Sequence, residues 1–317
     1  MLRLAAFPAL PSSSAKAVSM PSYPFWKVTP SGNPTILLRA EDVPPALRAA
    51  TASAVMDAQH LGGEQVGYIR LEGTPRLDMM GGEFCLNATR AFAAVLDSLD
   101  LLTKDGSVRR GAVEVSGASG PVAVRVIREE GSLPIAEACL HFDALPAPEA
   151  LPGGSRLVRV PGIVHLIQNG PAPFAPGDAA LNDFCTAQRN DLGLEQEEAV
   201  GHLWLRPDDA ANGSMGDSEE AGDSPANDGP ASALRLDPVV WVRDTATLCF
   251  ESACGSGTLA CALAEHAASG RTLFSIRQPS GQPLSVRMER NGDGWDVWVG
   301  GPVRLTACGE TDLSGLL

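Results

Sequence analysis

The sequence predicts an α+β protein of two similar halves, each a mixed sheet around a long helix. Three observations lead to this prediction. Strand-like and helix-like patterns are interleaved along the 317 residues. The pattern restarts near residues 152–154, and a cysteine begins a small-residue helix in each half, at Cys85 and at Cys254. Such an internal duplication indicates two pseudo-symmetric domains that face each other. Because ligands commonly bind between domains, we expect the active site in the cleft between them.

The first domain is expected over residues 22–152. Two strand-like runs are joined by a turn at Ser31-Gly32-Asn33, and a helix with prolines in its first turn follows them. A longer helix begins at the first cysteine, and three strand-like runs close the domain. The strands are expected over 24–30, 34–40, 64–72, 111–117, 122–129 and 137–145, and the helices over 44–59 and 85–102.

The second domain is expected over residues 153–300, beginning with "RLVRVPGIVHLIQNG", a run similar to the first hairpin. Two helices are expected, one over 182–193 and one that starts at the second cysteine. Residues 301–317 are expected to form a C-terminal segment that returns to the first domain. The later strands are expected over 202–207, 238–244, 247–252, 274–278, 284–289 and 295–305.

The charge of the chain limits its partners. The net charge is −14, which disfavours nucleic-acid and anionic-membrane surfaces, since both require clustered Lys and Arg. Half of this charge lies in residues 207–233, which hold seven acids and no base; we predict a disordered acidic insertion there. Residues 1–21 are expected to be a disordered leader. No apolar run approaches the roughly 18 residues of a membrane span, and the odd count of seven cysteines favours reduced thiols and a cytoplasmic location.

Two helix-start cysteines suggest acid–base chemistry. The free amides at a helix N-terminus favour an anion, so we expect them to lower the pKa of each thiol and to hold a carboxylate. Two such starts on opposite sides of one carbon would let one thiolate remove a proton while the other thiol delivers one, which inverts the stereocentre. The substrate is then expected to lie against the first residues of both helices: Leu86, Asn87, Gly255, Ser256 and Gly257.

The remaining features are expected to be structural. A buried cysteine is usually a small core hydrophobe, and the five other cysteines are assigned to the core on this basis: Cys139, Cys185, Cys249, Cys261 and Cys308. No metal-ligand spacing, dinucleotide fingerprint or pyridoxal-lysine context is present in the sequence, so we expect neither a metal nor a cofactor.

The motifs "GGEFCLNAT" and "ESACGSGT", with "PSGN" and "GIVHLI", resemble those of the diaminopimelate epimerase-like family of cofactor-independent amino-acid racemases and epimerases. The resemblance covers residue 22 to the C-terminus apart from the insertion. It implies that Cys85 and Cys254 are the catalytic thiols. It also implies that Asn33 contacts the substrate and that His165 lies near the reacting amino group.

The sequence also departs from the family pattern. Leu86 replaces the usual Gly after the first cysteine, and positions that hold polar groups in diaminopimelate epimerases carry Arg76, Ile163, Thr245 and Ala246. These changes argue against a substrate with a second charged end. The combination of "GGEFC-x-NAT" with "EQVGYI" is most similar to histidine racemases of opine-type metallophore pathways. That resemblance implies that Glu64 and Gln65 line the side-chain pocket, with Glu64 accepting an imidazole N–H.

Three functions therefore remain open from the sequence. The first is a racemase that interconverts L- and D-histidine for metallophore synthesis, with a free amino acid as its partner and a homodimer as a possible assembly. The second is diaminopimelate epimerase. The third is a non-enzymatic redox or small-ligand module whose two cysteines form a reversible disulfide.

Overall fold

The computed structural model describes residues 22–208, 234–244 and 246–313. The predicted leader and residues 209–233 of the predicted insertion lie outside the described residues. Pro207 and Asp208, which the prediction assigned to that insertion, belong to the fold. Pro207 ends a strand, and the buried Asp208 carboxylate accepts a hydrogen bond from Arg277 Nε at 2.5 Å.

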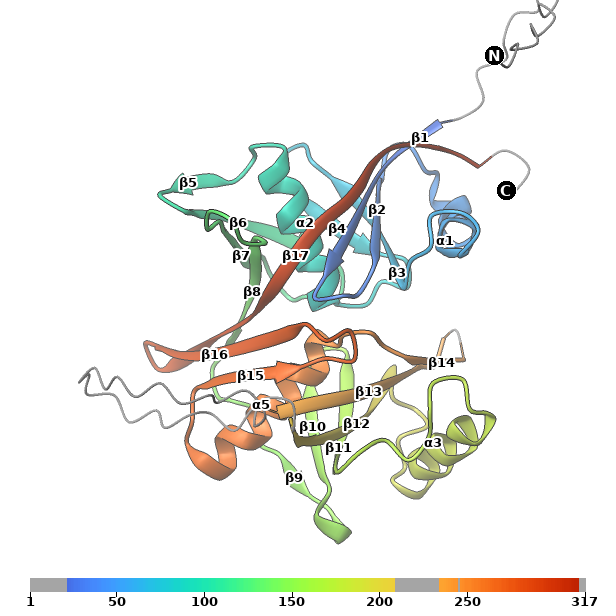
Figure 1. Ribbon diagram of the computed structural model, residues 1–317, viewed down its shortest axis with the longest axis vertical. Coiled ribbons are helices and arrows are strands. Elements are labelled where there is room, and N and C mark those ends of the chain that lie inside the picture. Colours follow the sequence, from blue (N-terminus) through green and yellow to red (C-terminus); the bar gives the residue numbers. More distant parts are fainter. Residues whose placement is uncertain (1–21, 209–233, 245, 314–317) are drawn as a thin grey trace, which may run out of the picture.

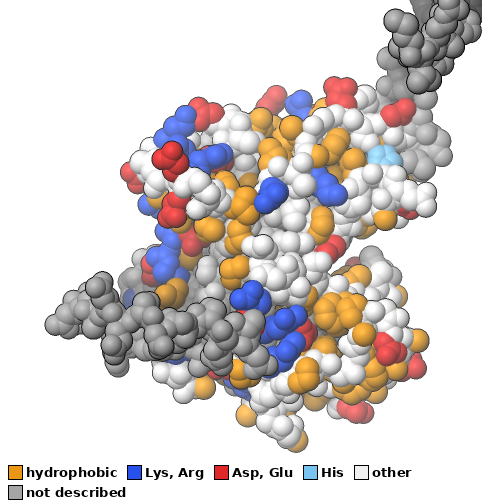
Figure 2. Space-filling view, viewed as in Figure 1, with side chains coloured by type: hydrophobic (Ala, Val, Ile, Leu, Met, Phe, Trp, Pro, Cys, Tyr) orange, Lys and Arg blue, Asp and Glu red, His pale blue; other side chains and the backbone are white. Residues whose placement is uncertain are grey.

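The described chain has a mixed α+β fold, as predicted. Figure 1 shows two lobes, one containing helix α2 (Leu86–Ser98) and the other containing α5 (Gly255–Ser269). The surface narrows to a waist where the lobes meet (Figure 2). Among the described helices, none combines the length and the apolar character that crossing a bilayer requires.

The strands of the first lobe surround α2. Strand β1 pairs antiparallel with β2, β2 pairs parallel with β3, and β3 pairs antiparallel with β4. The chain then continues through the antiparallel ladder β6–β7–β8. The elements are β1 (Ser22–Pro30), β2 (Thr35–Arg39), η1 (Pro45–Leu47), α1 (Arg48–Met56), β3 (Gln65–Arg70), β4 (Arg76–Met79), β5 (Thr103–Asp105), β6 (Val108–Val115), β7 (Val122–Ile127) and β8 (Ile135–Phe142).

The second lobe repeats this pairing order. Strand β10 pairs antiparallel with β11, β11 pairs parallel with β12, and β12 pairs antiparallel with β13. The duplication seen in the sequence is therefore present in the strand topology. The elements are β9 (Glu149–Ala150), η2 (Pro152–Gly154), β10 (Arg156–Val160), β11 (Ile163–Asn169), α3 (Ala179–Asp191), β12 (Ala199–Pro207), β13 (Leu234–Val242), β14 (Thr247–Phe250), β15 (Leu273–Arg277) and β16 (Pro283–Asn291).

One long strand, β17 (Gly294–Asp312), runs through both lobes (Figure 1). Its first part, from Trp295 to Pro302, pairs with β8, and this part also pairs with β16. Its last part, from Val303 to Asp312, pairs with β1. The strand extends seven residues beyond the predicted end at Leu305, because β1 supplies a partner from Val303 to Asp312.

Helices α2 and α5 are central, whereas α1 and α3 lie at the surface. Nine residues of α5 are buried, and α2 is buried over most of its surface, as expected for helices surrounded by sheet. In contrast, α1 and α3 each bury only three side chains. Buried residues around α2 and α5 form one continuous apolar cluster, in which Phe92 and Leu263 are members from the two helices.

The core assignment of the cysteines is only partly correct. Cys139, Cys185 and Cys261 are buried, as predicted. Cys249 and Cys308 are exposed, so the prediction was wrong for these two. Cys249 lies on the short strand β14, and Cys308 lies in the part of β17 that pairs with β1. All seven cysteines are free thiols.

Candidate active site

Cys85 is the N-cap of α2. Its Sγ accepts a hydrogen bond from the Ala88 amide at 3.4 Å, and the Thr89 hydroxyl donates to the Cys85 carbonyl at 2.7 Å. The side chain therefore satisfies one of the amides that the first helical turn leaves without an internal partner. The Cys85 backbone is extended, which directs the thiol across the start of the helix.

Cys254 caps α5 in the same way. Its Sγ accepts from the Gly257 amide at 3.3 Å, and the Thr258 hydroxyl donates to the Cys254 carbonyl at 2.7 Å. In both helices the sulfur is bonded by the amide three residues later and the carbonyl by the threonine four residues later. The internal duplication therefore extends to individual hydrogen bonds.

The two helix starts touch each other. The Asn87 side-chain amide donates to the Ala253 carbonyl at 2.8 Å, just before the second cysteine. A Cβ atom placed on Gly255 would lie 2.8 Å from Leu86 Cβ and 3.1 Å from Asn87 Oδ1. Leu86 therefore fits after the first cysteine because the equivalent position after the second has no side chain. The structure brings the predicted residues at both helix starts into one place.

A line of neutral side chains reaches the first thiol. Cys85 donates to Gln65 Oε1 at 2.9 Å, and Gln65 Nε2 donates to Asn33 Oδ1 and to the Thr35 hydroxyl at 2.7 Å. These bonds hold the Gln65 amide with its oxygen toward the sulfur. The predicted site residues Asn33 and Gln65 thus belong to the surroundings of Cys85.

Glu64 connects the two lobes. Its carboxylate accepts hydrogen bonds from the Asn33 side chain and from the hydroxyl and amide of Ser252, which precedes the second cysteine by two residues. Both Glu64 oxygens are therefore engaged within the protein. Its predicted role as acceptor of an imidazole N–H stays a prediction.

Two residues near the second thiol were not identified from the sequence. The Glu251 carboxyl lies within hydrogen-bonding reach of the Cys254 side chain. The Gln278 side chain accepts from the Cys254 amide at 3.0 Å and donates to the Thr258 hydroxyl at 3.0 Å. Ser256 also approaches, with its hydroxyl 3.6 Å from the Cys254 sulfur. A carboxyl three residues before a helix-start cysteine was a signal that could have pointed to Glu251, whereas Gln278 comes from a distant strand end.

The expected lowering of the cysteine pKa values is wrong. Burial raises the pKa of Cys85 to about 12, and the charges of Glu83 and Glu251 add to this. Burial and then Glu251 raise the pKa of Cys254 well above its usual value. The helix amides do favour the thiolates, but they are outweighed because loss of water penalises an anion more strongly. Burial, together with the charge of Glu64, also raises the pKa of Glu251 to about 7.

His165 is fully buried on β11 and carries no hydrogen bond on either ring nitrogen. Burial, and then the nearby His202, lower the pKa of His165 to about 3, so the ring is neutral. Its ring covers Gly201, since a Cβ there would lie 2.0 Å from His165 Nδ1. Gly201 shares a sheet face with Leu203, which packs against Gly257 in the first turn of α5. The buried imidazole therefore lies on the α5 side of its sheet.

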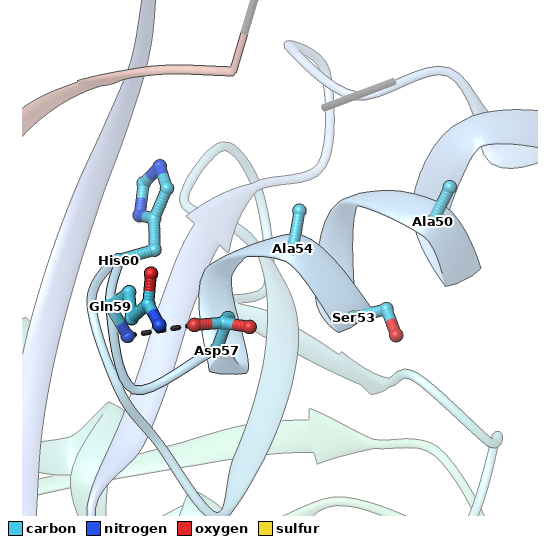
Figure 3. A pocket seen from close by; sticks show the side chains of 6 residues that line it. All are labelled: Ala50, Ser53, Ala54, Asp57, Gln59 and His60. Atoms are coloured by element: carbon cyan, nitrogen blue, oxygen red, sulfur yellow. Dashed lines mark hydrogen bonds between the residues drawn. The ribbon is translucent and has the colours of Figure 1, made fainter. Parts of the chain in front are cut away.

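Two surface cavities lie away from the cysteines. One of about 600 Å³ lies on α1 and the turn after it, where the Gln59 backbone N–H donates to Asp57 Oδ1 (Figure 3). The other, of about 440 Å³, includes Arg159 and Arg243. Neither is lined by the cysteines or by the side chains hydrogen-bonded to them. Over the described ranges, no three His, Cys, Asp or Glu side chains are grouped in a way that could hold a metal ion.

The fold is similar to those of known epimerases and of related proteins. A hydroxyproline epimerase from Agrobacterium vitis, solved with trans-4-hydroxy-L-proline, superposes with a TM-score of 0.59 at 12% identity, covering 92% of this chain and 93% of that one. A phenazine biosynthesis protein of the PhzF family from Enterococcus faecalis superposes with a TM-score of 0.57 at 17% identity, covering 92% and 99%. These matches show the fold.

The sequence matches are more specific. Residues 23–140 match the family model described as the histidine racemase CntK N-terminal domain. A histidine racemase from Fusobacterium nucleatum subsp. nucleatum is 27% identical over 290 residues, which cover 90% of this chain and 95% of that protein. The predicted resemblance to histidine racemases is confirmed, and so is the prediction of an isomerase of the racemase and epimerase class.

Proposed function

We propose that this protein is a cofactor-independent amino-acid racemase that interconverts L- and D-histidine by a two-thiol mechanism. The observation that carries the proposal is the pair of touching helix starts, each capped by a cysteine with the same hydrogen bonds. In this proposal, the substrate binds where the two lobes meet, at the starts of α2 and α5. Sequence similarity to histidine racemases over most of the chain supports the choice of substrate.

In the proposed reaction, the thiolate of one cysteine removes the α-proton of the bound amino acid. An S–H bond forms as the Cα–H bond breaks, and the electron pair moves toward the substrate carboxylate. The free amides of both helix starts are placed to stabilise the negative charge that develops there. The opposite thiol then protonates the other face of the carbon and becomes a thiolate. The proton count is balanced, and the two cysteines exchange roles for the other enantiomer.

The surroundings of Cys85 support a neutral, hydrogen-bonding side chain on the substrate. Gln65 and Asn33 offer an amide surface next to the thiol, and Glu64 lies beside them. The far end of diaminopimelate carries an ammonium and a carboxylate, and burying either without a partner costs several kcal/mol. A discrimination of about 10²-fold or more against diaminopimelate follows. We place the reaction in opine-type metallophore synthesis, as the similarity to histidine racemases suggests.

The test is proton exchange in D₂O without any added cofactor. With L-histidine, we expect deuterium at the α-carbon and growth of D-histidine on chiral chromatography. The double variant Cys85→Ala/Cys254→Ala is the control for contaminating racemases. Faster turnover of diaminopimelate than of histidine would favour the epimerase alternative. If no amino acid exchanges while both thiols are reduced, the enzymatic proposal is wrong and a thiol-redox or ligand-binding role remains.

A further inference from the structure

Arg90 is a buried cation that the reaction scheme above does not use. It lies in α2 with no exposed surface and is the largest fully buried side chain among the described residues. Its guanidinium donates to the Ala136 carbonyl at 2.9 Å, to Asn87 Oδ1 at 3.3 Å and to the Ser31 hydroxyl at 3.0 Å. These three acceptors come from three different segments, and all are uncharged.

No carboxylate within the described ranges lies at ion-pair distance from this guanidinium. Glu137 is close enough to favour the charged form of Arg90, but the Glu137 carboxylate is paired with Arg125. Burial lowers the pKa of Arg90 to about 9. A buried charge without an ionic partner is unfavourable, and an apolar side chain of similar size would fill the same space. The position therefore indicates a need for positive charge.

The hydrogen bonds show where that charge acts. Arg90 points back toward the start of its own helix, since it bonds Asn87, which follows Cys85 by two residues. A negative charge on Cys85 would stabilise the Arg90 cation, and the attraction is mutual. Glu83 and Glu251 both oppose the ionisation of Cys85, so a cation near the start of α2 acts against two carboxylates.

The same guanidinium also influences the second helix start. It fixes the oxygen of the Asn87 amide, which leaves the amide nitrogen directed at the Ala253 carbonyl, 2.8 Å away and next to Cys254. Its third acceptor, Ser31, belongs to the turn that ends at Asn33, and the Ser31 carbonyl accepts from the Ser280 hydroxyl of the other lobe at 2.6 Å. Arg90 is thus bonded to the segments that position both thiols.

We propose that Arg90 is a positioning residue with an electrostatic role: its guanidinium holds Asn87 across the junction of the two helix starts and stabilises the thiolate form of Cys85. The inference deepens the proposed function, on which it rests only in treating Cys85 as a base. The hydrogen bonds and the thiol chemistry can be tested without any substrate.

The test compares Arg90→Gln, which removes the charge but keeps hydrogen-bonding groups, with Arg90→Lys, which keeps the charge. The rate of iodoacetamide alkylation of each cysteine is followed at pH 8.5 by peptide mass spectrometry, with the exposed Cys308 as internal reference. Loss of about one pKa unit of stabilisation lowers the thiolate fraction about tenfold. We therefore expect Arg90→Gln to slow Cys85 alkylation about tenfold relative to Cys308, and Arg90→Lys to change it less than about threefold.

Equal rates in Arg90→Gln and the unsubstituted protein would overturn the electrostatic role, and equal slowing in both variants would reduce Arg90 to a packing residue. If Arg90→Gln does not fold, Glu137→Gln decides, because Glu137 favours the charged form of Arg90 and is not among the groups that act on Cys85. Alkylation of Cys85 should then become slower, and no change would contradict the inference. A protein that passes this test but racemises no amino acid would refute the proposed function and leave the Arg90–Cys85 interaction standing.

Discussion

The starts of α2 and α5 have the same backbone arrangement but different electrostatic surroundings. Each is capped by a cysteine whose sulfur and carbonyl accept equivalent hydrogen bonds. The Cys85 thiol, however, donates to a neutral amide and lies near a buried guanidinium, whereas Cys254 lies beside a carboxyl. The two halves therefore share the helix-start geometry but differ in the groups around each sulfur. We infer that the two thiols are equivalent in position but not in acidity.

The largest expected effect comes from removing either sulfur. Cys85→Ala and Cys254→Ala should each lower histidine racemisation at least about 10³-fold, because each thiol serves only one face of the carbon. The remaining thiolate can still remove a proton from one enantiomer. In D₂O we expect each variant to exchange the α-proton of one enantiomer only, and the two variants to differ in which one. If both variants exchange the same enantiomer, the two helix starts do not lie on opposite faces of the substrate.

The second prediction concerns the Glu251 carboxyl, which is within hydrogen-bonding reach of Cys254 but acts on Cys85 through its charge. Ionised Glu251 can accept the Cys254 proton, and its pKa of about 7 places this change between pH 6 and 8. The rate kcat/KM should rise over that interval. Glu251→Gln should remove this rise and lower kcat/KM about tenfold at pH 8. The variant Gln65→Glu places a carboxyl next to Cys85 and tests whether it introduces a second rise in kcat/KM with pH. An unchanged pH profile in Glu251→Gln would contradict the difference between the two sites.

Stability provides a control for the same residue. The folded-state pKa of Glu251 is raised, so the folded protein binds more protons than the unfolded chain between about pH 4.5 and pH 7. This contribution to the free energy of unfolding is complete below pH 4.5 and is lost as the pH rises through 7. The stability of Glu251→Gln relative to the unsubstituted protein should therefore be greater at pH 8 than at pH 5. Urea unfolding of both proteins at the two pH values measures this difference.

The third prediction concerns Gly255, where the start of α5 lies closest to Leu86 at the start of α2. Gly255→Ala puts a Cβ 2.8 Å from Leu86 Cβ, and such overpacking typically costs about 1–3 kcal/mol. We expect lower thermal stability and about tenfold slower racemisation. Leu86→Gly alone should cost less activity, and Leu86→Gly/Gly255→Ala should recover most of the loss. A double variant no better than Gly255→Ala would show that Asn87, 3.1 Å from the same point, limits the approach instead.

The smallest effects are expected at the two threonines. Thr89→Val and Thr258→Val each remove a hydroxyl that donates to a cysteine carbonyl at 2.7 Å. Each should lower the free energy of unfolding by about 1 kcal/mol. The Thr258 hydroxyl also accepts from Gln278, whose buried side-chain nitrogen donates to the Ile276 carbonyl as well, so Thr258→Val removes one of these two hydrogen bonds and should be the more destabilising of the two. Chemical unfolding of both variants measures the difference.

The local features of this protein follow from short segments of its sequence. Both helix starts, the hairpins and the restart of the pattern were predictable, because they depend on turn residues, alternation and helix-start signals within short windows. The short strands β4 and β5 were missed, since three or four residues carry too little periodicity. The two cysteine motifs could also be identified from the sequence, because each lies within a short stretch of residues. Asn33, Gln65 and Asn87 were named from sequence, and the structure joins them to the surroundings of the thiols.

The electrostatics of the two thiols depend on the tertiary structure. Whether a helix start lowers a thiol pKa depends on how much water is removed from it, and strands and turns distant in the sequence bury these two sulfurs. The exposure of Cys249 and Cys308 and the approach of Gln278 to Cys254 have the same origin. Each depends on which segments pack together across long separations in the chain, and the residue pattern of a single segment carries no information about its distant neighbours.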